Sequence, residues 1–141
     1  SIIENMGVST SRVRIEDGSG LSRKNSVSPG FLVSFLTAIS RQSCFGTYLR
    51  TFNNPGPDEH IFSTSALGIR RRIRLKSGSM GGVLCYCGYI LPQSNAISPT
   101  GTSKETSTGE TIAFSIMIND SIQSTTRLRN YIESVLSEYI K

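Results

Sequence analysis

The stretch IRRRIRLKSGSMGGVLCYCGYIL, residues 69–91, decides the fold of this chain. From Ile69 apolar and cationic side chains alternate with a period of two, which is typical of a β-strand. Ile73, Leu75 and Ser77 share one face of this strand, and the cations at positions 72, 74 and 76 share the other. Two glycines then favour a turn. The VLCYCGYIL segment that follows is apolar on both faces, which indicates an interior strand covered on both sides.

The segments around this stretch supply a third strand and two helices. TIAFSIMIN, residues 111–119, alternates like a strand, and an apolar stripe after about Ser124 predicts a C-terminal helix. Ser28 and Pro29 are a favourable N-cap and first residue for a helix over 29–42. Sequential strands with short links favour antiparallel pairing. The sequence therefore predicts an α+β fold, an antiparallel sheet with flanking helices. The second sheet face is covered by the helix at 29–42 or by protein outside this chain.

The remaining segments carry weaker patterns. RVRIEDGSGLS, residues 12–22, begins as a short strand and breaks at its glycines. FGTYLRTF, residues 45–52, is predicted as a short helix, and NNPGPDE after it as a loop. The polar segment over 91–110, rich in Ser, Thr and Gly, is predicted to be a long exposed connection.

Composition limits the classes of function. The chain has 141 residues, enough for one domain, and its net charge of +5 favours anionic partners. No apolar run reaches the length of a membrane span, and no signal peptide opens the chain. The three cysteines do not form a disulfide framework; Cys85 and Cys87 would share one strand face, where packing is favoured over a bridge. His60 is the only histidine, too few ligands for a zinc site, and no cofactor is implied.

Residues 76–79, with the sequence KSGS, are a candidate anion site at a strand end. The Lys76 ammonium and the hydroxyls of Ser77 and Ser79 can bind a carboxylate, and Gly78 lets a ligand lie against the backbone. The N–H of Ser79 can help to hold an oxyanion. The plain alternative is a strand end that runs into a turn, since such a triplet arises by chance in roughly one chain of this length in ten.

A second motif, DGSGLSR at residues 17–23, stands upstream of a helix that begins with Ser-Pro. Alone it predicts a hydrogen-bonded turn between a strand and a helix. Followed some fifty residues later by KSGSMGGV and GYI, it closely resembles the D-Ala-D-Ala carboxypeptidase/endopeptidase family, peptidase family S13 or class C low-molecular-mass penicillin-binding proteins. The resemblance covers about residues 13–118, and the last helix is also in its expected place.

The resemblance implies a fold, an activity and partners. The fold is the C-terminal part of a β-lactamase/transpeptidase-like domain. The activity is that of a serine-type carboxypeptidase or endopeptidase, which cleaves peptidoglycan stem peptides through an acyl-enzyme and binds β-lactams. Such enzymes act outside the cytoplasmic membrane, so a periplasmic or extracytoplasmic location is implied.

The resemblance also assigns roles to individual residues. Lys76, Ser77 and Gly78 match the family's Lys-Thr/Ser-Gly active-site box, and the N–H of Ser79 would be one oxyanion donor. Leu21 and Arg23 match the lining of the pocket for the stem side chain, where Arg23 would pair with a free carboxylate. Gly81 falls where some relatives carry a serine that assists there. The residues Asp17 to Gly20 would fix the loop.

Two family motifs are missing from this chain. The mechanism needs a Ser-x-x-Lys box, which holds the nucleophile, and a Ser-x-Asn box, and neither occurs in residues 1–141. In the family both lie N-terminal to the region that matches. We therefore expect residues 1–141 to be a C-terminal portion of the penicillin-binding domain that is catalytically inert alone. We also expect it to expose an apolar patch, which favours a homodimer formed through that patch or an exchange of elements between copies.

Three other functions stay open. A non-catalytic module could keep the stem-peptide pocket and lack the chemistry. The basic run from Arg70 to Lys76 could bind nucleic acid, although it lacks interleaved aromatic residues, so no nucleic-acid partner is predicted. A Ser/His/Asp triad with His60 and one of Asp17, Asp58 or Asp120 is formally open, but nothing in the sequence places these residues together.

Overall fold

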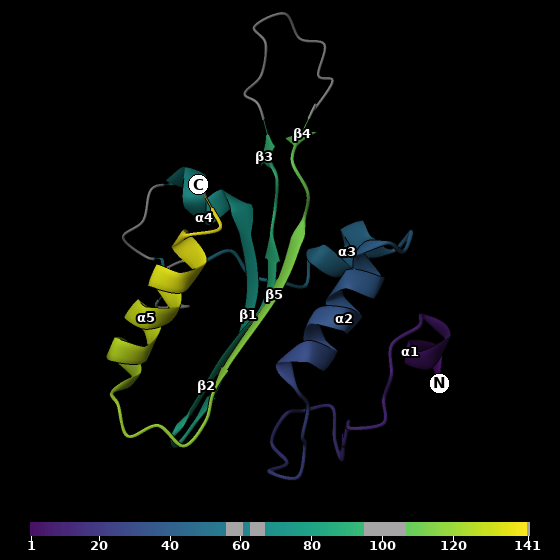
Figure 1. The fold of residues 1–141 in the computed structure, drawn as a ribbon, viewed down its shortest axis with the longest axis vertical. Coiled ribbons are helices and arrows are strands. Elements are labelled where there is room, and N and C mark those ends of the chain that lie inside the picture. The colour runs from purple at the N-terminus through teal and green to yellow at the C-terminus, as the bar shows by residue number, and fades with distance from the viewer. Residues whose placement is uncertain (56–60, 63–66, 95–106, 141) are drawn as a thin grey trace, which may run out of the picture.

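A three-stranded antiparallel sheet with a helix on each face forms the centre of the protein. The computed structural model describes residues 1–55, 61–62, 67–94 and 107–140. The strands are β1 (Ile73–Met80), β2 (Val83–Ile90) and β5 (Ile112–Ile118), in the spatial order β1-β2-β5. Figure 1 shows α5 (Thr125–Ser137) on one side of this sheet and α2 (Pro29–Ser40) on the other. The predicted α+β architecture is confirmed.

The hydrophobic core lies between the sheet and α5. β1 and β2 pair without interruption from Ile73↔Ile90 to Met80↔Val83, so the alternation predicted for both strands is confirmed. Buried side chains on one sheet face pack against three from α5 and the residues that follow it. The sheet contributes Ile73, Leu75, Leu84, Tyr86, Ile90 and Phe114, and the helix side contributes Ile132, Leu136 and Ile140.

The helix α5 forms as its sequence predicts. The Ser124 hydroxyl accepts from the N–H of Arg127 at 3.3 Å, which caps the first turn. The apolar stripe is not buried throughout its width, because Tyr131 and Tyr139 are 63% and 59% exposed. Only the centre of the stripe therefore faces the sheet.

The opposite sheet face is covered by α2 and α3 (Phe45–Leu49). Ser28 caps α2 by accepting from the N–H of Phe31 at 3.1 Å, and Pro29 is its first residue. Tyr89 of β2 joins these helices to the sheet: its hydroxyl donates to the Leu36 carbonyl at 2.8 Å, and its ring contacts the ring of Phe45 with centroids 5.2 Å apart. The sequence left open whether this face is covered by the helix at 29–42 or by protein outside the chain, and the structure shows that α2 covers it.

The first strand begins later than predicted. Residues 69–72 were expected to open the period-two strand, but the structure places them in helix α4 (Leu67–Arg72), and β1 begins at Ile73. Ile69 and Ile73 are four residues apart, a spacing that fits one helix face as well as one strand face. The pattern was therefore ambiguous at this point.

The predicted strand in RVRIEDGSGLS is wrong. Only an isolated bridge forms, in which Arg14 and Ser26 exchange backbone hydrogen bonds of 2.9 and 2.8 Å. The side-chain oxygen of Asn25 accepts the N–H groups of Glu16 and Asp17 at 2.7 and 3.3 Å. A side chain that takes these donors competes with strand pairing.

Between β2 and β5 the chain extends as a narrow ribbon. β3 (Gln93–Ser94) pairs with β4 (Ser107–Thr108), and Figure 1 shows this ribbon projecting beyond the sheet. The long connection predicted over 91–110 is thus paired at both ends, and its centre lies outside the described residues. In the described parts of the chain, no helix is long and apolar enough to cross a membrane.

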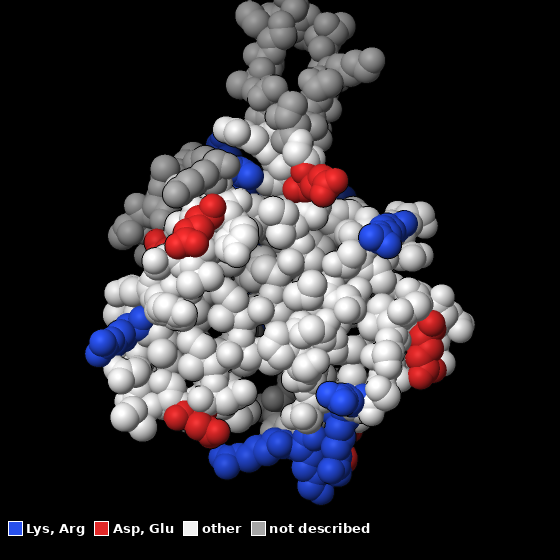
Figure 2. All heavy atoms as spheres, viewed as in Figure 1, with Lys and Arg blue, Asp and Glu red and all other residues white. Residues whose placement is uncertain are grey.

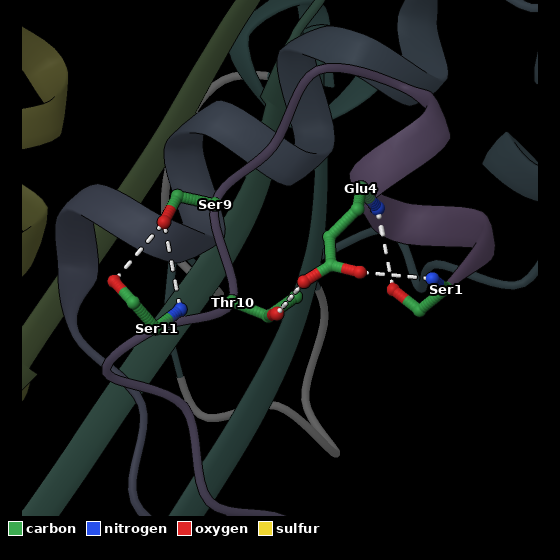
Figure 3. A network of polar contacts seen from close by, with 5 residues as sticks. All are labelled: Ser1, Glu4, Ser9, Thr10 and Ser11. Atoms are coloured by element: carbon green, nitrogen blue, oxygen red, sulfur yellow. Dashed lines mark hydrogen bonds and ion pairs between the residues drawn. The ribbon is translucent and has the colours of Figure 1, made fainter.

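The N-terminal segment packs as a short capped helix, α1 (Ile2–Asn5). Figure 3 shows the Glu4 carboxylate between two donors: the terminal amine of Ser1 at 2.9 Å and the hydroxyl of Thr10 at 2.6 Å. The amine and these hydrogen bonds lower the pKa of Glu4 to about 2. The same contacts tie Thr10 to α1.

Candidate active site

The predicted Lys-Ser-Gly-Ser box lies on β1, near the turn that leads into β2. Lys76 and Gly78 belong to the sheet face that α2 covers, whereas Ser77 and Ser79 belong to the face of α5, as strand alternation requires. Lys76, Gly78 and Ser79 are exposed, and Ser77 is half-buried. A Cβ built on Gly78 would meet no atom within 4 Å, so its backbone is open to a ligand.

The backbone of β1 presents its polar groups to the edge opposite β2. Leu75 donates to the Asn53 carbonyl at 2.9 Å and accepts from the Asn53 N–H at 3.0 Å, so both of its backbone groups point away from β2. This direction alternates along an antiparallel strand, and positions 77 and 79 therefore point to the same outer edge. The N–H of Ser79 therefore faces this outer edge.

The Lys76 ammonium is available to an anion. Its Nζ donates to the carbonyl of Ser77 at 3.1 Å, and it forms no ion pair with the carboxylates that the structure describes. Across the sheet it stands opposite Cys87. Burial raises the pKa of the Cys87 thiol, nearby Cys85 raises it further, and Lys76 acts in the opposite direction. The positive charge of Lys76 therefore acts on the Cys87 thiol of the same sheet face.

The DGSGLSR loop is organised around one carboxylate. Asp17 accepts from the Ser19 hydroxyl at 2.9 Å, the Asn25 amide at 2.9 Å, and the N–H groups of Gly20 and Ser22, both at 3.2 Å. The Asn25 and Ser19 hydrogen bonds, in that order, lower the pKa of Asp17. Gly20 has φ +78, a left-handed conformation that glycine adopts without strain. The loop conformation therefore follows from its own sequence.

This loop presents its last residues outward. Leu21 is 83% exposed, and Arg23 is exposed and makes no ion pair with any described residue. Gly81 is exposed in the β1–β2 turn. No hydrogen bond or ion pair joins residues 12–27 to Lys76–Ser79. The structure thus shows both predicted motifs in defined conformations, and no polar contact connects them directly.

Positive charge gathers at one end of the molecule. Figure 2 shows a group of Lys and Arg side chains at the lower end of the view, where the segment that leads into α2 lies in Figure 1. Four cations of that segment are exposed, and Glu16 neutralises one of them, with the Arg14 guanidinium at 2.7 Å. The four are Arg12, Arg14, Arg23 and Lys24.

The basic run from Arg70 is used within the fold. The Nε of Arg70 donates to the Pro55 carbonyl at 3.2 Å, and Arg72 donates to the carbonyls of Leu91 and Ile140. Arg74 likewise donates to backbone carbonyls, at 2.9 and 3.0 Å. These guanidinium groups tie α4 and β1 to neighbouring segments, so three of the five cations of the run are engaged within the fold, while Arg71 and Lys76 are exposed.

Two hollows of about 210 and 330 Å³ lie elsewhere, between residues 6–13 and α2. None of the predicted site residues lines either one. Of the triad residues, His60 and Asp58 lie outside the described residues. No group of three or more His, Cys, Asp or Glu side chains gathers in the described part of the chain.

Comparisons with known proteins agree with the two motifs. Residues 1–138 match the D-Ala-D-Ala carboxypeptidase 3 (S13) family. A penicillin-sensitive carboxypeptidase A of Dictyostelium discoideum is 29% identical over 141 aligned positions, which cover 96% of this chain and 25% of that protein. The chain thus spans about a quarter of that relative's length.

Solved structures share the fold. Penicillin binding protein 4 of Haemophilus influenzae superposes with a TM-score of 0.69 at 26% identity, over 99% of this chain and 30% of that one. The same protein complexed with a β-lactam gives a TM-score of 0.73 at 24% identity, over 99% and 31%. The family match covers nearly the whole chain, and the chain therefore belongs to the D-Ala-D-Ala carboxypeptidase 3 (S13) family.

Proposed function

We propose that this chain forms one wall of the active site of a serine-type D-alanyl-D-alanine carboxypeptidase or endopeptidase. The whole enzyme would bind penicillin and cleave peptidoglycan stem peptides through an acyl-enzyme, outside the cytoplasmic membrane. The observation that carries the proposal is the outer edge of β1 in a chain of the S13 family. There, an exposed lysine and an outward backbone N–H stand three residues apart.

The residues Lys76–Ser79 act by binding negative charge on the substrate. The Lys76 ammonium attracts the terminal carboxylate of the stem peptide, and the hydroxyls of Ser77 and Ser79 donate hydrogen bonds to it. The Ser79 N–H stabilises the oxyanion that develops when the scissile carbonyl is attacked. Because no described carboxylate pairs with Lys76, its positive charge is not cancelled locally.

The DGSGLSR loop would read the side chain of the stem peptide. Leu21 offers an exposed apolar contact and Arg23 an unpaired guanidinium, which binds a carboxylate in a two-point geometry. Gly81, exposed in the β1–β2 turn, contributes no side chain to this pocket. The Asp17 network holds the loop backbone in place before the substrate arrives, which reduces the entropy lost on binding.

The nucleophile has to come from outside residues 1–141. A Ser-x-x-Lys sequence is absent from the chain, so we propose that these residues are the C-terminal portion of the domain and are inactive alone. The intact mass of the chain should not change after incubation with penicillin. A penicilloyl adduct on this chain would overturn the proposed inactivity.

The gene upstream of Ser1 provides the test of the function. We expect it to encode Ser-x-x-Lys and Ser-x-Asn, and in the protein that carries them Lys76→Ala should slow acylation by penicillin about 100-fold or more, the effect of losing one electrostatic contact to the oxyanion or carboxylate. Lys24→Ala, at an exposed lysine outside the box, is the control and should leave the rate unchanged. An upstream sequence without the boxes would instead favour a stem-peptide binding module without catalysis.

We also propose that the isolated chain self-associates. The exposed large apolar side chains lie on several elements, among them Leu21, Ile122 at 97% exposure and Tyr131. Light scattering should then show a dimer at high concentration. A monodisperse monomer at all concentrations would contradict this.

A further inference from the structure

Two cysteines of β2 and a methionine of β5 lie on one face of the sheet. Cys85 and Cys87 are two residues apart on β2, so their side chains point to the same side. Cys85 stands directly opposite Met117 of β5. All three are half-buried on the face that α2 covers, and both cysteines are free thiols. Two thiols and one thioether are thus concentrated in a small area.

Two neighbours of Cys87 would stabilise a thiolate there, although burial and Cys85 keep its pKa raised in the metal-free chain. In the sheet it stands between Lys76 of β1 and Ser115 of β5. Lys76 supplies a positive charge, and the Ser115 hydroxyl is buried without any hydrogen-bond partner among the described residues. A buried hydroxyl costs free energy unless it is hydrogen-bonded. A thiolate at Cys87 would give that hydroxyl an acceptor.

The spacing of the sulfur atoms suits a single metal ion. Directly opposed residues on antiparallel strands have Cβ atoms about 5 Å apart, and residues two apart on one strand are separated by about 7 Å. Thiolates on one metal lie up to about 4.6 Å apart, since each metal–sulfur bond is about 2.3 Å. The side chains of Cys85 and Cys87 can tilt toward one another, which brings their sulfur atoms closer together than their Cβ atoms. Soft thiolate and thioether ligands select soft ions such as Cu⁺.

We propose that Cys85, Cys87 and Met117 form a binding site for a thiophilic monovalent metal ion, Cu⁺. On binding, the two S–H bonds break, two sulfur–metal bonds form, and two protons leave to solvent, while copper stays in its +1 state. Two thiolates, the ion and the Lys76 ammonium then sum to zero charge, which favours a half-buried position. Zinc is a poor fit because it prefers four donors, and the described neighbours supply no histidine.

Titration with Ag⁺, a stand-in for Cu⁺ that undergoes no redox chemistry, tests the site in the intact chain. One ion should bind tightly, and Cys85→Ser and Cys87→Ser should each weaken binding by about 10-fold or more, with a smaller loss for Met117→Leu. Cys44→Ser is the matched control, since Cys44 is exposed and lies on another element. Competition with a Cu⁺ chelator should rank the variants in the same order. Equal affinity in the Cys85/Cys87 double variant would overturn the proposal, as would loss of binding in Cys44→Ser.

A second measurement needs no substitution and so does not depend on the folding of variants. The folded chain is alkylated with iodoacetamide with and without one equivalent of Ag⁺, and the modified cysteines are located by peptide mapping. The ion should protect Cys85 and Cys87 and leave Cys44 reactive. Equal protection of Cys44, or protection of neither β2 thiol, would refute the site.

Discussion

Gly88 offers the sharpest test of how β1 and β2 pack. A Cβ built on this glycine would lie 1.9 Å from the carbonyl oxygen of Arg74 and 2.9 Å from the Cα of Leu75. Leu75 is directly opposite Gly88, and its hydrogen bonds go to Asn53 instead of β2. The two residues therefore form a non-hydrogen-bonded pair, the type in which the strand backbones approach most closely. Gly88→Ala must push the strands apart.

The size of the effect follows from this geometry. Real Cβ atoms essentially never approach another atom closer than 3.0 Å, so the backbones must separate by more than an ångström at this point. Overpacking of this kind costs about 1–3 kcal/mol, and each flanking inter-strand hydrogen bond that is weakened adds about 1 kcal/mol. We expect a loss of about 3–4 kcal/mol in the free energy of unfolding, a large share of a typical total of about 5–15 kcal/mol.

Thermal and urea denaturation followed by circular dichroism measure the loss. For a chain of this size the midpoint should fall by about 10 °C. Gly46→Ala is the matched control: Gly46 lies in α3, has no atom within 4 Å of an added Cβ, and alanine should stabilise the helix by about 0.5–1 kcal/mol. A Gly88→Ala protein with the same midpoint of thermal unfolding as the wild type would refute the close pairing of β1 and β2.

Two further predictions concern the polar contacts of single side chains. Asn25→Ala should raise the pKa of Asp17, measured by NMR titration of its carboxyl group, because the Asn25 amide is the main cause of the lowered value. The folded pKa of Asp17 is lowered, so its contribution to stability is present above the unfolded value and is lost as the pH falls through the folded value; no shift on substitution would rule out the network. Tyr89→Phe should destabilise the fold by about 1 kcal/mol, because it removes the buried hydroxyl that donates to the Leu36 carbonyl. Tyr139→Phe, at an exposed tyrosine, should change little, and equal effects of the two would contradict the α2 contact.

The sheet was predictable because each strand carries its own periodicity. In β2, residues such as Leu84 and Cys85 alternate between faces, and both faces are apolar because a helix covers each. The helix α2 was predictable for a different reason, since Ser28 and Pro29 mark its beginning locally. Strand alternation and helix caps act over a few residues, so the sequence carries them without any tertiary information.

The errors fall where local signals conflict. At residues 69–72 the spacing fits helix and strand equally, and the tertiary contacts of Arg70 and Arg72 with distant carbonyls accompany the helix. In residues 12–22 the alternating pattern does not produce a strand. Two backbone N–H groups donate to the side-chain oxygen of Asn25 instead of to a partner strand. Neither outcome can be read from periodicity alone, because the deciding partner lies elsewhere in the chain.

The sequence by itself determined the family and the three strands of the central sheet, apart from the beginning of β1. The motifs DGSGLSR and KSGS carry that information in a few residues at a fixed order, and the family match agrees with it. Only the tertiary structure decided that α2 covers the second face, that the backbone at Ser79 points outward, and that Cys87 lies between Lys76 and Ser115. These facts depend on strand order and register, which arise when segments distant in sequence pair and bury their apolar faces together.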